Sequence, residues 1–83
     1  MQVFSTILDG VKIIEPQLYK DSRGFFLESY KEITYLENEV NFQFIQDNRS
    51  RSSKKVLRGL HFQKSFPQGK LVSCTYGEIY DVV

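Results

Sequence analysis

The sequence contains one cysteine, no signal-peptide pattern and no apolar run long enough to cross a membrane. Because a single cysteine, Cys74, cannot form a disulfide within the chain, a reducing compartment is expected, and we predict a cytoplasmic protein. The net charge is only +1. A bulk charge so close to zero gives no reason to expect binding to nucleic acid or to a membrane surface, so neither is predicted as a partner.

The length of 83 residues leaves room for one small domain. A chain of this size buries roughly 60–65% of the surface that its unfolded form exposes, so it is marginally stable alone. Residues 81–83 continue an apolar strand pattern, and a strand at the edge of a sheet needs a partner. We therefore expect residues 1–83 to form a single partial domain, which is either the N-terminal portion of a longer β-barrel or a chain whose sheet is completed by a second copy.

Short apolar runs separated by turn-forming residues occupy the first half of the chain. This pattern predicts strands over residues 11–15, 25–28 and 42–48, with residues 17–19 as an edge piece. Residues 21–24 begin with aspartate and end with glycine, which is typical of a turn.

One helix is expected between the strands predicted at residues 25–28 and 42–48. Ser29 and Glu32 fit a capping box, in which serine is the N-cap and glutamate is the N3 residue. Apolar residues then follow at helical spacing, so the sequence predicts a short helix over residues 30–38 that Asn38 or Asn41 ends.

The second half of the chain again has the pattern of strands separated by loops. Strands are predicted over residues 56–63, 70–75 and 78–83, and residues 49–55 form a polar basic loop. Many short strands at regular spacing with a single helix are typical of an all-β sandwich or barrel. The predicted fold class is therefore mostly β.

The single histidine, His61, follows Arg58 by three residues in an otherwise apolar run. An imidazole exchanges protons near neutral pH, and a guanidinium holds anionic groups through paired hydrogen bonds. A regular strand would direct the two side chains to opposite faces, but Gly59 lies between them, and glycine within a strand often marks a β-bulge. We predict that a bulge turns both side chains into one cavity. The alternative is a strand histidine with only local hydrogen bonds.

A metal site is not expected. Gln63 stands where the His-x-His pair of a cupin metal site would place its second histidine. One histidine and one cysteine do not supply the three or four ligands that a typical site needs. We therefore predict a metal-free cavity without a cofactor.

Other polar residues have two interpretations each. From its sequence context, Lys70 is expected to be a solvated lysine at a strand end. The alternative is a cation that stabilises an oxyanion. Amides and a carboxylate at residues 46–48 either form a turn or recognise the edge of a sugar or base. The basic residues of the 49–55 loop are usually only solvated, although they could attract a nucleotide diphosphate.

Five segments together resemble the dTDP-4-dehydrorhamnose 3,5-epimerase family. They are D-S-R-G-F-F-L-E at 21–28, Q-D-N-R-S-R-S at 46–52, V-L-R-G-L-H-F-Q at 56–63, Q-G-K-L-V at 68–72 and Y-G-E-I-Y-D-V at 76–82. The motifs occur in order, with the spacing of the family, over essentially the whole chain.

The resemblance implies a cupin-like (jelly-roll) β-barrel that forms a metal-free homodimer. It implies epimerisation at C3 and C5 of a dTDP-4-keto-6-deoxyhexose, a dTDP-sugar on the route to dTDP-L-rhamnose and surface polysaccharide such as lipopolysaccharide. It makes His61 the general base and Lys70 the cation that holds the enolate. The positions that match substrate-binding residues of the family are Arg23, Phe26, Glu28, Gln46, Asp47, Asn48 and Arg58.

The general acid of the family, a tyrosine, matches no residue of this chain. The resemblance therefore predicts that the 83-residue polypeptide is inactive or nearly so by itself, since a base without its partner acid exchanges a proton but does not readily invert a centre. Two alternatives stay open. One is a single-centre epimerase that acts on another dTDP-4-keto sugar, and the other is a truncated, non-catalytic remnant that binds nucleotide sugar or only self-associates.

Overall fold

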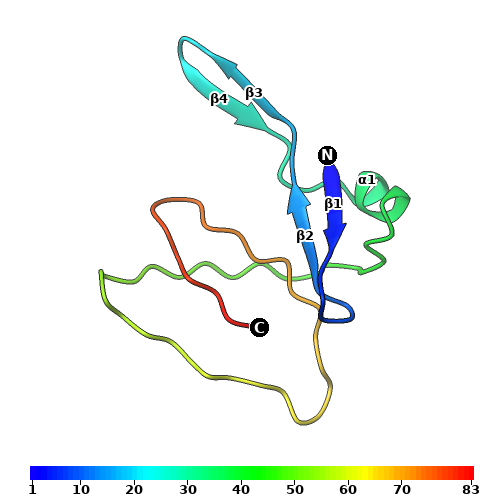
Figure 1. The fold of residues 1–83 in the computed structure, drawn as a ribbon, viewed down its shortest axis with the longest axis vertical. Helices are drawn as coiled ribbons and strands as arrows, with labels where there is room; N and C mark the ends of the chain where they lie inside the picture. Colours follow the sequence, from blue (N-terminus) through cyan, green and yellow to red (C-terminus); the bar gives the residue numbers. More distant parts are fainter. The chain divides into compact units, whose positions relative to one another are not determined.

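The computed structural model describes residues 1–83, which divide into two units, residues 1–43 and residues 44–83. All regular secondary structure belongs to the first unit, as Figure 1 shows. This unit contains two separate two-stranded antiparallel sheets followed by one short helix. The structure is therefore mostly small antiparallel sheets with one helix, in agreement with a mostly β fold class.

The first sheet pairs β1 (Gln2–Ser5) with β2 (Lys12–Glu15). The strand β2 confirms the strand predicted at residues 11–15, whereas β1 was not predicted. The hydroxyl of Thr6 holds the connection together, because it accepts a hydrogen bond from the backbone N–H of Leu8 (3.2 Å) and donates one to the carbonyl of Val11 (3.0 Å).

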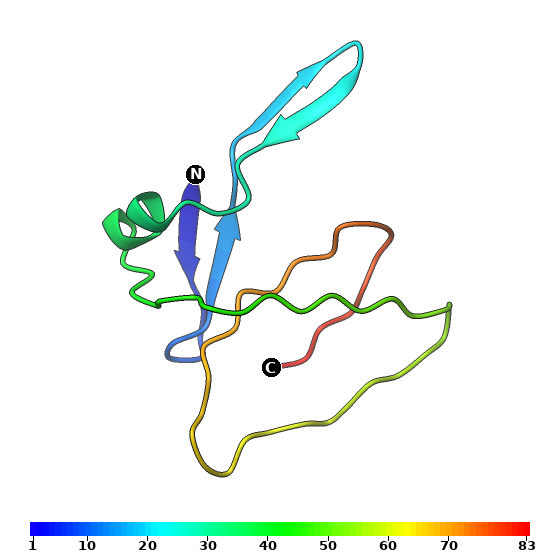
Figure 2. The same cartoon turned by 180° about the vertical axis from the view of Figure 1, so that it is seen from behind.

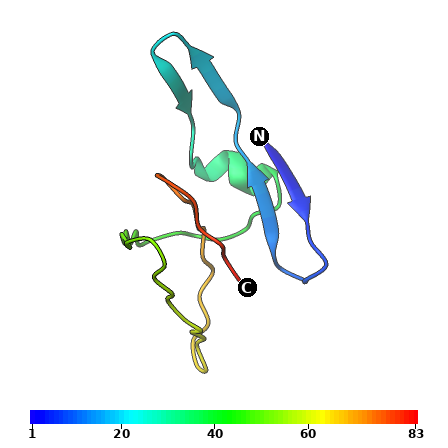
Figure 3. The same ribbon diagram turned by 60° about the vertical axis from the view of Figure 1, so that its left-hand side comes forward.

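The second sheet pairs β3 (Leu18–Asp21) with β4 (Gly24–Leu27) across a two-residue turn. The turn predicted at residues 21–24 is confirmed, and the predicted edge piece is a full strand that extends to Asp21. Figure 3 shows the two hairpins following one another along the chain. Gly24 closes the turn with φ of 135°, a conformation that side-chain-bearing residues rarely adopt.

The helix α1 (Glu32–Glu37) lies within the predicted range, and Asn38 is its C-cap as expected. The capping-box prediction is wrong. Lys31 is the N-cap with no side-chain hydrogen bond, and the carbonyl of Ser29 instead accepts a 2.7 Å hydrogen bond from the hydroxyl of Tyr35. The first turn of the helix therefore starts two residues later than the box requires, because the Tyr35 contact holds the Ser29 backbone outside the helix.

The C-terminal end of α1 is a Schellman motif. The N–H of Val40 donates to the carbonyl of Tyr35 (2.9 Å), and the N–H of Glu39 donates to that of Leu36 (3.1 Å). Glu39 has φ of 61°, the left-handed conformation that the motif requires. Tyr35 and Val40, the two residues joined by the outer bond, are the only buried hydrophobic residues of the chain.

Tyr35 is the centre of this small core. Its ring packs edge-to-face on Tyr30, with ring centroids 4.8 Å apart. Burial, followed by the nearby Tyr30 and Glu28, raises the pKa of the Tyr35 hydroxyl. The tyrosine is thus held as a neutral hydrogen-bond donor to the Ser29 carbonyl.

The second unit, residues 44–83, contains no helix and no strand. Figure 2 shows its trace from behind as a continuous coil. The predictions of strands at residues 42–48, 56–63, 70–75 and 78–83 are therefore wrong for this structure. So is the predicted bulge at Gly59, because a bulge exists only within a paired ladder.

The physical reason is the lack of a partner. An alternating pattern specifies which face of a strand is buried, but the strand forms only when neighbouring N–H and C=O groups pair with its own. Every residue from 45 to 83 is exposed, so this unit has no buried apolar core that could hold such a pairing. The second unit therefore has the sequence pattern of β-strands but none of the backbone pairing that would join them into a sheet.

Candidate functional site

The residues predicted to form the site fall into both units. Arg23, Phe26 and Glu28 belong to the first. The rest of the set belongs to the second unit and comprises Gln46, Asp47, Asn48, Arg58, His61 and Lys70. Two groups of contacts have defined geometry, one at the β3–β4 hairpin and one between residues 51 and 58.

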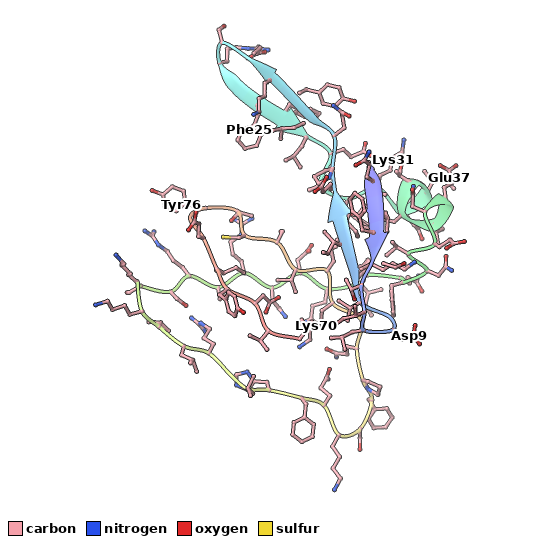
Figure 4. All side chains as sticks on the ribbon, in the orientation of Figure 1. Asp9, Phe25, Lys31, Glu37, Lys70 and Tyr76 are labelled. Carbon is pink, nitrogen blue, oxygen red and sulfur yellow. The ribbon has the colours of Figure 1, made fainter.

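The tip of the β3–β4 hairpin carries an open hollow of about 460 Å³. Phe26 lies opposite Tyr19 in the strand register, with their ring centroids 6.4 Å apart, and both residues line the hollow. Figure 4 shows the neighbouring Phe25 side chain on the same hairpin. The hollow combines aromatic faces with charged groups, since Lys20, Asp21 and Arg23 also line it. Such a surface can stack a planar ring beside an ionic contact.

An ion pair orders the turn of this hairpin. The Nε and Nη2 atoms of Arg23 both donate to Oδ2 of Asp21, and the Arg23 backbone N–H donates to Oδ1 at 2.8 Å. The side-chain bond from Arg23, followed by this backbone bond, lowers the pKa of the Asp21 carboxyl below its usual 3.8. The Arg23 side chain is nevertheless 87% exposed, so its remaining N–H groups face solvent and are accessible to a ligand.

The Q-D-N segment is only partly organised. The side-chain amide of Gln46 donates to Oδ1 of Asn48 at 3.2 Å, which places these two predicted binding residues side by side. All three residues of the segment are exposed.

Arg58 has the best-defined contacts of the second unit. Its Nε donates to Oγ of Ser52 at 2.8 Å, and its Nη2 donates to the carbonyl oxygen of Arg51 at 3.2 Å. The guanidinium is therefore bound to the loop that precedes it. Sequence reasoning missed this role of Ser52, and the only signal for it was the serine-rich composition of the loop beside an arginine.

His61 and Lys70 are both exposed, and no hydrogen bond joins them. The imidazole lies near Gly59, because a Cβ added to that glycine would meet Nδ1 of His61 at 4.0 Å. Figure 4 shows Lys70 on the coil of the second unit, with Tyr76 at a separate bend. No hydrogen bond or ion pair joins Arg58 to His61 either, and the common cavity for these two side chains stays a prediction.

No group of three or more His, Cys, Asp or Glu side chains is placed to hold a metal ion. The helix α1 is too short and too polar to cross a membrane, and the chain has no other helix.

A family model described as dTDP-4-dehydrorhamnose 3,5-epimerase matches residues 5–83. The chain therefore belongs to this family. The resemblance noted from the five sequence motifs is confirmed.

Several similar proteins carry the name dTDP-4-dehydrorhamnose 3,5-epimerase. The one from Methanothermobacter thermautotrophicus is 54% identical over 77 residues, which cover 93% of this chain and 42% of the relative. The one from Escherichia coli K12 is 48% identical over 85 residues, which cover 99% of this chain and 45% of the relative. The one from Neisseria gonorrhoeae is 46% identical, with 99% of this chain and 25% of the relative covered. The chain thus spans less than half the length of these curated relatives. No solved structure matches it.

Proposed function

We propose that this chain supplies the proton-abstracting half of a dTDP-4-dehydrorhamnose 3,5-epimerase. The observation that carries the proposal is the match to the family over residues 5–83, a range that includes all nine predicted site residues. The substrate would be a dTDP-4-keto-6-deoxyhexose on the route to dTDP-L-rhamnose and to surface polysaccharide. The protein would act in the cytoplasm.

His61 is proposed as the general base. The C4 ketone of such a sugar acidifies the C–H bonds at C3 and C5, and an imidazole titrates close to the working pH. Removal of the proton leaves negative charge on the ketone oxygen, and Lys70 is proposed to stabilise it. These two roles need neither a metal nor a redox cofactor, so a metal-free mechanism is proposed.

The substrate would be held at its two ends. Arg58 and Arg23 offer guanidinium groups to the diphosphate, because forked donors fit phosphate oxygens. The exposed aromatic face around Phe26 would pack on the nucleotide, and Glu28 would contribute to the same end. The polar side chains of residues 46–48 would contact the sugar or base through their hydrogen-bonding groups.

The working enzyme is proposed to be a cupin-like jelly-roll barrel assembled as a homodimer. Support comes from the second unit, whose strand-patterned segments at residues 56–63, 70–75 and 78–83 are exposed and form no strand. Additional strands, from a longer family chain or from a second copy, would pair their backbones and bury their apolar faces. Residues 1–83 would then be one part of a single barrel domain.

Because no residue of this chain matches the family's acid tyrosine, the chain alone is proposed to be inactive or nearly so as an epimerase. Two alternatives differ in the chemistry that each would carry out on the sugar. A single-centre epimerase would process only C3 or only C5. A non-catalytic remnant would bind nucleotide sugar, or only associate with itself, without exchanging a proton.

Incubation of the chain with the dTDP-4-keto-6-deoxyhexose in deuterated water tests these proposals together. Deuterium at both C3 and C5, read by NMR, with loss of exchange in His61→Asn, is the expected result. Label at one carbon would favour the single-centre enzyme. Binding without label would favour the remnant, and full conversion to the inverted sugar would contradict the proposed inactivity of the isolated chain.

A further inference from the structure

The side chain of Arg58 is fixed along one edge of its guanidinium. Nε and one N–H of Nη2 form that edge, and they donate to Ser52 Oγ and to the Arg51 carbonyl oxygen. A guanidinium has five N–H groups in one plane. The two bonds therefore leave three: one on Nη1 and one on Nη2 form the outer edge, and the second on Nη1 points to the opposite side.

The outer edge, like the side edge, presents two parallel N–H groups that can bind two oxygens of a phosphate. A free arginine side chain carries about 2 kcal/mol of rotamer entropy, which binding must overcome. Because two bonds to the loop already restrict the Arg58 side chain, less freedom is left to lose when an anion binds. The contacts with the loop thus occupy the side edge and restrict the guanidinium, and they leave the outer edge open to a phosphate.

The loop that holds Arg58 is itself defined by the backbone. The N–H of Val56 donates to the carbonyl of Ser53 at 3.3 Å, and Lys55 has a left-handed φ of 70°. This turn lies between Ser52 and Arg58 and brings the two residues within hydrogen-bonding distance although six positions separate them. No acidic residue occurs between Asp47 and Glu78, so no carboxylate of the segment competes for the guanidinium.

We propose that Ser52 is a positioning residue, which orients the Arg58 guanidinium through its side edge so that the outer edge receives the diphosphate of a nucleotide. This rests on the proposed function, in which Arg58 contacts the substrate. Ser52 itself would not touch the ligand, and its effect would therefore depend on the arginine.

Calorimetric titration of the full 83-residue chain with thymidine 5′-diphosphate tests the proposal. Ser52→Ala is expected to weaken binding about tenfold, the size of effect expected when a hydrogen bond to a charged group is lost. Ser52→Thr keeps the hydroxyl and is expected to restore most of the affinity. Ser53→Ala is the matched control, because no hydrogen bond of the Ser53 side chain is present, and it should bind as the unaltered chain does.

A second readout separates positioning from a general loss of structure. Thymidine lacks the diphosphate, so its affinity should be the same for Ser52→Ala and the unaltered chain, whereas unfolding of the loop would weaken both ligands. The double variant Ser52→Ala/Arg58→Ala should bind thymidine 5′-diphosphate no more weakly than Arg58→Ala alone.

Other outcomes would contradict either the positioning role of Ser52 or the substrate-binding role of Arg58. If Arg58→Ala weakens binding and Ser52→Ala does not, the positioning role is wrong while the proposed function stands. If Arg58→Ala has no effect, the substrate-binding role of Arg58 is wrong and the role of Ser52 is wrong with it. If the unaltered chain showed no measurable binding of thymidine 5′-diphosphate, the proposal that Ser52 orients Arg58 for a diphosphate would be wrong.

Discussion

The ammonium group of Lys12 on β2 lies 2.7 Å from the carbonyl oxygen of Glu39, which follows the C-terminal end of α1. This hydrogen bond joins two elements 27 residues apart in sequence. A cation at this end of a helix also interacts favourably with the helix dipole.

Replacement of Lys12 by methionine is therefore expected to destabilise residues 1–43. Methionine keeps most of the aliphatic stem but removes the donor, so the expected loss is up to about 1 kcal/mol for an exposed bond of this kind. Lys12→Arg should retain most of the stability. Urea titration followed by circular dichroism would measure the effect, and equal midpoints for Lys12→Met and the unaltered chain would show that the bond contributes nothing.

Replacement of Glu39 by glycine is expected to stabilise the same unit. Glu39 occupies the C′ position of the Schellman motif with φ of 61°, where a side chain costs about 1–2 kcal/mol and glycine costs almost nothing. The greater freedom of glycine in the unfolded chain offsets part of this gain, so a net increase of about 0.5–1 kcal/mol is expected.

Thermal unfolding checks that prediction against a matched variant. Glu39→Ala removes the same charge but keeps a Cβ, so it should not raise the melting temperature as Glu39→Gly does. If the two variants shifted the melting temperature equally, the gain would come from charge removal and not from the left-handed backbone.

The Asp21 carboxyl is expected to titrate below 3.8, because the hydrogen bonds from the Arg23 side chain and backbone lower its pKa. A lowered pKa in the folded state means that the stabilising contribution is present above the unfolded value and is lost as the pH falls through the folded value. Acid should therefore loosen the β3–β4 turn only below about pH 3.8. Carboxyl chemical shifts measured against pH would show the pKa directly, and Arg23→Gln should return it toward 3.8.

Local signals in the sequence predicted the first unit well. The turn at residues 21–24, the strand predicted at residues 11–15 and the helix end at Asn38 each depend on nearby residues, and each is confirmed. The Tyr35 hydroxyl bond to Ser29 depends on a side chain six positions away that competes with the capping box, so the start of the helix was misjudged.

The second unit could not be predicted from its pattern. The alternation in residues 56–63 specifies a strand that is paired on both edges or covered on one face, and neither condition is met here. The family resemblance predicted which residues form the site, because it depends on residue identity at fixed spacing. It could not predict that the Arg58 guanidinium is bound to Ser52, which depends on the conformation of the loop.

Charge is distributed unequally along the chain, and this predicts a salt-dependent association rate. Residues 44–83 carry seven Lys and Arg against three acidic residues, whereas residues 1–43 carry four against seven. The small net charge of the whole chain hides this asymmetry. An anionic nucleotide should therefore be attracted to the second unit before contact, and such attraction raises association rates most at low ionic strength.

The double variant Lys54→Gln/Lys55→Gln is expected to slow association of a fluorescently labelled thymidine diphosphate several-fold at about 10 mM salt, where the Debye length is about 30 Å. The difference should vanish near 1 M salt, where the Debye length is about 3 Å. Stopped-flow measurement decides between the possibilities, since a deficit that persisted at 1 M salt would mean that the two lysines contact the ligand directly and do not act at a distance.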